Sequence, residues 1–191
     1  MSSALLRIYG RNNSFNVQKV LWCCAELALP FERMDRGGEF GGTATREYRA
    51  MNPTGRIPTI DDNGFILWES NTIVRYLAAR HGMGRLCPRD DRARASAERW
   101  MDWQLAHLWP ALVPAFMGLV RTPPEKRNRE TIRTAAQQTA EQFTLLDAHL
   151  RKSNFVNGAE GRAGGMMTEI RVCEPGLTTT AACLDGSDIA P

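Results

Sequence analysis

The strongest constraint in this chain lies in residues 52–60, where two prolines and a glycine interrupt a short β-branched run, NPTGRIPTI. Pro58 has no backbone N–H for a sheet, so we expect a strand to begin after it, followed by a turn and a second strand. A cis bond before Pro58 would turn the backbone of Ile57 outward, where a peptide-like ligand can pair with it. The alternative is a rigid loop with trans prolines, and the stretch alone leaves both interpretations open.

Composition restricts the class of protein. The chain has 191 residues, of which 43% are hydrophobic and 24% charged, and its net charge is +3. These values predict a globular protein of one or two domains with no basic patch for nucleic acid. We expect no membrane span, because no apolar run approaches about 20 residues, and we expect no signal peptide. The five cysteines have no framework spacing, which favours reduced thiols in a cytoplasmic protein.

The first 82 residues alternate between strand and helix patterns, and residues 36–42 between them are too rich in glycine for regular structure. In chain order, the patterns predict strands at 5–9 and 31–35, a hairpin at 58–68, and helices around 17–27, 48–51 and 73–77. The order β-α-β-α-β-β-α predicts a thioredoxin-like domain over residues 1–82. In such a domain the loop after the first strand, Pro58 and the start of the last helix meet at one edge.

The second half predicts an all-helical domain over residues 88–158. One long helical pattern follows Asp90, and Pro110 and Pro114 are expected to kink or break it. A further helix is predicted to start at Pro123 and to continue to Leu150, with one apolar face.

Four motifs in the first half resemble the N-terminal domain of the glutathione S-transferase family. They are GRNNS at 10–14, ELALPFE at 26–32, NPTGRIPTI at 52–60 and LWESNTIVRYL at 67–77. The pattern is most similar to the bacterial type that uses serine or asparagine, near the theta and zeta classes. The resemblance implies a cis Ile57–Pro58 bond and a homodimeric transferase, without a metal, that conjugates glutathione to a hydrophobic or halogenated electrophile.

The resemblance also implies which residues bind glutathione. The backbone of Ile57, before Pro58, would pair with the cysteinyl unit, while Glu69 and Ser70 would hold the γ-glutamyl end. A carboxylate suits the ligand's amine, and a hydroxyl at a helix N-terminus suits its carboxylate. Further candidates around the ligand are Arg11, Asn16, Phe40 and Arg56.

The catalytic candidate is Ser14, which matches the family's serine at the start of the first helix. It would donate a hydrogen bond to the glutathione thiolate rather than act as a nucleophile. The free thiol has a pKa of about 8.5, so such a donor is needed near neutral pH. Asn12 and Asn13, or Asn16, are amide donors in the same turn and are alternatives. A third interpretation is that Ser14 only caps the helix.

The resemblance ends near residue 158. From there glycine, threonine and alanine dominate and no helical period persists, so we predict a poorly ordered tail at 159–191 and an incomplete helical domain. A shifted reading frame is our hypothesis for this change, and a natural variant tail is the alternative. Two alternative functions follow: a glutathione-dependent peroxidase or disulfide reductase, and a glutathione-binding module without turnover.

Overall fold

In the computed structural model, the described residues are 5–153 and 156, and contacts divide the chain into two compact units, 1–95 and 96–191. The predicted tail and its hypothetical shifted frame fall on residues 159–191, which lie outside the described residues.

A four-stranded sheet in the order β2-β1-β3-β4 forms the centre of the first unit. Strand β1 (Leu6–Tyr9) pairs in parallel with β2 (Phe31–Met34) and antiparallel with β3 (Thr59–Asp62). Strand β4 (Phe65–Trp68) closes the hairpin with β3. In β1 alternate side chains face the core, since Leu6 and Ile8 are buried and Arg7 is exposed.

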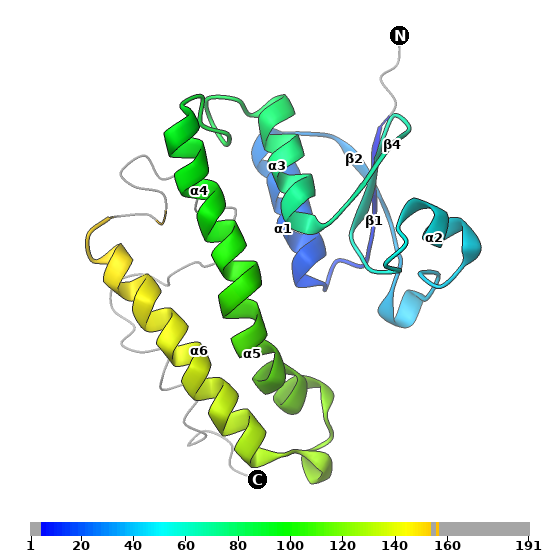
Figure 1. The fold of residues 1–191 in the computed structure, drawn as a ribbon. Coiled ribbons are helices and arrows are strands. Elements are labelled where there is room, and N and C mark those ends of the chain that lie inside the picture. The colour runs from blue at the N-terminus through cyan, green and yellow to red at the C-terminus, as the bar shows by residue number, and fades with distance from the viewer. Residues whose placement is uncertain (1–4, 154–155, 157–191) are drawn as a thin grey trace. The chain divides into compact units, whose positions relative to one another are not determined.

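Helices cover this sheet on both sides (Figure 1). Helix α1 (Phe15–Leu27) packs beside α3 (Ser70–His81), and α2 (Arg46–Met51) lies on the other side of the sheet. Val17, Val20 and Cys24 place the apolar side of α1 in the core, as their helical spacing predicts. The arrangement confirms the predicted thioredoxin-like fold.

One prediction about the loops of this unit is confirmed, and another is wrong. The Ile57–Pro58 bond is cis, as predicted. Residues 36–42 are not without regular structure, because Gly38–Phe40 form a 3-10 turn. Positive φ angles at the flanking Gly37 and Gly41 allow the chain to enter and leave this turn.

A long helical run begins shortly before the second unit and continues into it, and it changes its hydrogen-bonding pattern without breaking. Helix α4 (Asp91–Trp103) continues through a π-helical turn (Gln104–Leu108) into α5 (Trp109–Phe116) and a second π-helical turn (Met117–Arg121). Pro110 lies near the start of α5, where the wider turn before it accommodates the missing N–H. The prolines therefore do not break the run, as one of the two predicted outcomes had it: Pro114 lies inside α5, and a π-helical turn stands on either side of this helix.

Helix α6 (Arg129–Leu150) begins later than the sequence predicted. The segment Pro124–Lys126 is a separate 3-10 turn. The helix starts after Asn128, whose Oδ1 accepts a hydrogen bond of 3.0 Å from the N–H of Thr131. Its buried residues Ala135 and Leu146 belong to the predicted apolar face, and Leu146 packs in a cluster with Trp100.

Within the described residues, the helical run Asp91–Arg121 is long and apolar enough to be compared with a membrane span. It has 31 residues, a mean hydropathy of 1.2 in its most apolar window, and 22% of that window is buried. By length and composition alone it is long enough to cross a membrane. A core helix passes the same test, and α5 packs along α6 within this unit.

Candidate functional site

Two glycines allow three loops of the first unit to meet at Ile57. A Cβ atom on Gly10, after β1, would lie 2.5 Å from Cγ2 of Val17 and 3.4 Å from Cβ of Ile57. A Cβ atom on Gly37, after β2, would lie 3.1 Å from Cδ1 of Ile57. Only glycine permits so close an approach of the backbone. The loops that follow β1 and β2 therefore meet the loop that precedes β3, at the sheet edge predicted from the element order.

The backbone of Ile57 is available for pairing at this edge. The sheet register places Thr59 opposite Tyr9 and does not extend back to Ile57. Within residues 5–153, no backbone hydrogen bond engages the N–H or the C=O of Ile57. A ligand with its own peptide groups can occupy both positions as a short strand.

The N-terminal ends of α1 and α3 also meet. The hydroxyl of Ser70 donates a hydrogen bond of 3.3 Å to Oδ1 of Asn16. Neither helix has an acidic residue in its first turn, so the partial positive charge of each N-terminus is not compensated there. Glu69 precedes α3 with a φ angle of 71°, a left-handed conformation that is uncommon for a residue with a side chain. The residue is exposed, and its side chain makes no capping hydrogen bond to α3.

Ser14 occupies the N-cap position of α1, but its side chain makes no capping hydrogen bond. The residue is half-buried, and its hydroxyl is not used to cap α1. The two neighbouring candidates, Asn12 and Asn13, are exposed. Oδ1 of Asn13 accepts a hydrogen bond of 2.6 Å from the guanidinium of Arg11.

The other candidates differ in how closely they join this site. Arg11 lies against the glycine loop, since a Cβ atom on Gly38 would be 2.8 Å from its Nε. That Nε atom is buried and has no hydrogen-bond partner within the described chain. Phe40 is 50% exposed. The side chain of Arg56 is exposed, and its contribution here is its backbone carbonyl.

Sequence reasoning missed a buried polar network beneath Ile57. The side chains of Tyr48 and Asn52 donate hydrogen bonds to the carbonyl of Arg56 and contact the hydroxyl of Thr59. Burial is the main cause that raises the pKa of Tyr48, so its hydroxyl stays protonated. An Asn followed by Pro-Thr-Gly is a turn signature, and this signal could have drawn attention to Asn52.

A second feature that the sequence did not indicate is the buried Lys19, which is 4% exposed. Its Nζ lies 3.4 Å from Oδ1 of Asn71, between α1 and α3. This contact links α1 to the first turn of α3.

The cysteines of α1 do not contribute chemistry. Cys23 and Cys24 are fully buried, and burial raises the pKa of each thiol to about 12. This agrees with the prediction that both fill the core. Among residues 5–153 and 156, no group of three or more His, Cys, Asp or Glu side chains is placed to hold a metal ion.

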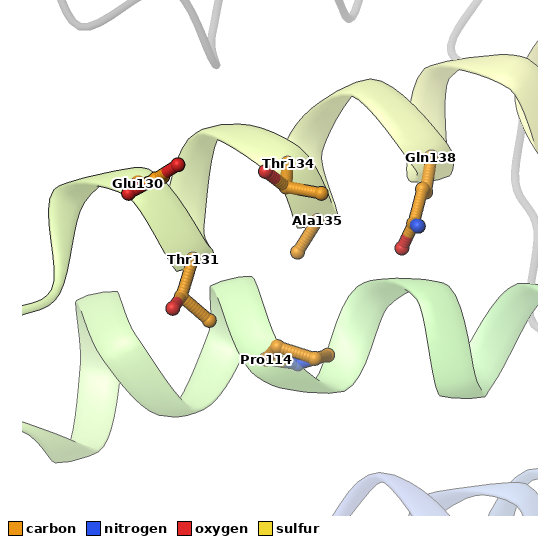
Figure 2. Close-up of a pocket in the computed structure, with 6 residues that line it drawn as sticks. All are labelled: Pro114, Glu130, Thr131, Thr134, Ala135 and Gln138. Atoms are coloured by element: carbon orange, nitrogen blue, oxygen red, sulfur yellow. The ribbon is translucent and has the colours of Figure 1, made fainter.

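The helical unit contains a hollow of about 260 Å³ that holds none of the predicted site residues. Pro114 lines it from one helix, and Thr131, Ala135 and Gln138 face it from α6 (Figure 2). Its lining offers hydroxyl, amide and carboxylate groups on an open surface, with no feature that points to catalysis.

Comparison with known proteins agrees with this geometry. Residues 8–86 match the family model "Glutathione S-transferase, N-terminal domain". Glutathione S-transferase GstB of Escherichia coli is 45% identical over 162 residues, covering 84% of this chain and 78% of that protein. Glutathione S-transferase 3 of Zea mays is 29% identical over 161 residues, covering 82% of this chain and 72% of that protein.

Solved structures give the same result. The theta-class glutathione S-transferase of Xanthomonas axonopodis pv. citri, crystallised with glutathione bound, superposes with a TM-score of 0.81 at 40% identity, covering 85% of this chain and 78% of that one. Poplar glutathione transferase F1, at 21% identity, shares the fold with a TM-score of 0.79 over 87% of this chain and 78% of that one.

The chain has a thioredoxin-like unit, a helical unit, and an open peptide-pairing position near the helix N-termini. This combination is typical of transferases that bind a thiol-containing peptide. The chain belongs to the glutathione S-transferase family. Its relatives include a bacterial member and a theta-class structure, in agreement with the type that the motifs indicated.

Proposed function

We propose that this protein binds glutathione at the edge formed by Ile57, Ser14 and Ser70 and transfers it to a small hydrophobic or halogenated electrophile. The observation that carries the proposal is the open backbone of Ile57, together with a Ser14 hydroxyl that makes no capping hydrogen bond at the start of α1. In this assignment the cysteinyl unit pairs with Ile57. Its sulfur then lies at the N-terminal end of α1, where a thiolate is favoured.

The γ-glutamyl end belongs at α3. The carboxylate of Glu69 meets the ligand's α-amine, and the N–H of Ser70 meets the α-carboxylate. The hydroxyl of Ser70 is already donated to Asn16, so its backbone N–H is the donor available to the ligand. Arg11, Phe40 and Arg56 border the glycyl end in this assignment.

The energy required of Ser14 is modest. Lowering the thiol pKa by about 2 units needs about 2.7 kcal/mol of preference for the anion. One hydrogen bond to a charged group supplies about 1.5–3 kcal/mol, and a helix N-terminus adds about 0.3–1 kcal/mol. The thiolate then attacks the carbon that carries the leaving group, the C–S bond forms, and the halide departs with the bonding electron pair.

We also assign the protein a homodimeric state and a cytoplasmic location. Membership in the family supports both. Light scattering of the purified protein tests the dimer, and fractionation of the native cells tests the location.

The experiment that tests the function combines binding with turnover. The protein should be retained on immobilised glutathione and should conjugate glutathione to a haloaromatic probe. Glu69→Gln should raise KM for glutathione about tenfold, because a charged hydrogen bond is lost. Glu141→Gln removes an exposed carboxylate from α6 and should leave KM unchanged.

Three outcomes of the retention and turnover experiment would contradict this proposal. The first is retention on glutathione without turnover of any electrophile, as expected of a binding module. The second is turnover of hydroperoxides or disulfides alone. The third is no retention at all.

A further inference from the structure

We propose that Tyr48 and Asn52 are positioning residues that hold the Arg56–Ile57 peptide in the orientation needed to receive glutathione. This inference rests on the proposed function, and it assigns to two buried residues a role that the site's own ligand contacts do not include.

Both residues are buried, with 2% of each exposed. The hydroxyl of Tyr48 donates to the carbonyl oxygen of Arg56 over 2.8 Å, and Nδ2 of Asn52 donates to the same oxygen over 2.9 Å. A carbonyl oxygen has two lone pairs, so these donors satisfy it completely. The carbonyl direction is therefore fixed from two sides.

The same two side chains also reach the residue that follows Pro58. Oγ1 of Thr59 lies 2.9 Å from the hydroxyl of Tyr48 and 3.0 Å from Nδ2 of Asn52. Arg56 and Thr59 flank Ile57 and Pro58 on either side. The pair thus holds both ends of the two-residue segment whose backbone would contact the ligand.

Peptide planarity carries this constraint to Ile57. The carbonyl of Arg56 and the N–H of Ile57 belong to one rigid, planar peptide unit and point in opposite directions. A carbonyl directed inward at Tyr48 and Asn52 turns the N–H of Ile57 away from them. Losing one donor lets this peptide unit rotate. The binding free energy of a ligand that pairs with Ile57 is then reduced by the free energy needed to order the unit.

Tyr48 is the better residue for a test because Asn52 has a second task. Oδ1 of Asn52 accepts hydrogen bonds from the N–H and the hydroxyl of Thr54, at 3.1 and 2.7 Å, and so shapes the turn itself. The Tyr48→Phe variant keeps the ring and its edge contact with Tyr9, whose centroid lies 6.4 Å away, and removes only the hydroxyl.

The matched control is Tyr76→Phe, in the same unit. The hydroxyl of Tyr76 also makes two hydrogen bonds, donating to Oδ2 of Asp62 over 2.7 Å and accepting from Arg80 over 3.0 Å. Both variants lose one hydroxyl with two partners. Only the first loses a contact to the ligand-pairing peptide.

The experiment measures the Kd of glutathione by calorimetry, KM and kcat with a haloaromatic probe, and the urea midpoint. Tyr48→Phe should raise the Kd and KM for glutathione about fivefold, with kcat at saturating glutathione unchanged. Tyr76→Phe should lower the urea midpoint without changing either constant. Asn52→Asp replaces the donor to Arg56 with an acceptor but keeps the Thr54 contacts. Asn52→Asp should also weaken glutathione binding. It tests the positioning role in place of Tyr48→Phe if that variant does not fold.

Glutathione binding that is unchanged in Tyr48→Phe, while the wild type binds, would overturn the positioning role alone. An equal loss of binding in Tyr76→Phe would also overturn it, since general destabilisation would then be sufficient. A wild type that does not bind glutathione would overturn the proposed function and the positioning role together.

Discussion

The hydroxyl of Ser70 donates a hydrogen bond of 3.3 Å to Oδ1 of Asn16, joining the first turn of α3 to that of α1. These residues are 54 positions apart in the chain, so the contact fixes the distance between two helix N-termini that the proposed ligand must bridge. It also uses the donor proton of Ser70, which leaves the backbone N–H as the group for an incoming carboxylate.

This contact predicts a coupled effect on glutathione binding. Ser70→Ala and Asn16→Ala should each raise KM for glutathione about threefold, because each loses the same neutral hydrogen bond. The double variant should be no worse than either single variant, since the residues act as a pair. Effects that multiply in the double variant would show that each residue contacts the ligand independently.

A second prediction concerns acid stability and Asp62. Burial alone would raise the pKa of this carboxyl group, but hydrogen bonds donated by Tyr76 and Asn63 and the charge of Arg80 outweigh it, and the net pKa is lowered. A lowered folded-state pKa stabilises the protein above the unfolded value, and this contribution is lost as the pH falls through the folded-state pKa.

Asp62→Asn should therefore reduce the free energy of unfolding by about 1 kcal/mol at pH 7. The difference from wild type should shrink below about pH 4, where the unfolded carboxyl group takes up its proton. Urea titrations of both proteins from pH 7 to pH 3 measure it. A difference that stays constant over this range would exclude the carboxylate as its source.

The thiols of Cys23 and Cys24 should be inert in the folded protein. With a pKa of about 12, the thiolate fraction at pH 8 is about 1 in 10,000, and the side chains are also inaccessible. Iodoacetamide should leave the peptide that carries both cysteines unmodified, as read by mass spectrometry, until guanidinium unfolds the chain. Rapid alkylation of either residue in the native protein would indicate an open or reactive α1.

Local sequence predicted much of the fold because the decisive residues act locally. Pro58 and the turn after Asp62 determine the hairpin, and the spacing of Val17, Val20 and Cys24 determines the buried side of α1. The start of α6 was misplaced because Pro123 and Pro124 are also typical of a helix start, whereas the Asn128 side chain supplies the cap that decides it.

The polar parts of the site could be predicted only in part. Ser14, Ile57 and Ser70 follow from motifs, but the partners of Tyr48, Asn52 and Lys19 depend on contacts across the fold. Nothing in a single sequence indicates that a tyrosine of a short helix will reach the carbonyl of Arg56, eight residues away. Buried hydrogen bonds of this kind require the backbone to be in place first.

The central claim is that Ser14 stabilises the thiolate of bound glutathione. The most direct measurement is a pH titration of thiolate absorbance near 240 nm in the glutathione complex. In the wild type, the thiol pKa should fall about 2 units below the free value of about 8.5. Ser14→Ala should return it most of the way, whereas the control Asn13→Ala should leave it low. A thiol pKa in Ser14→Ala equal to that of the wild type would contradict the assignment.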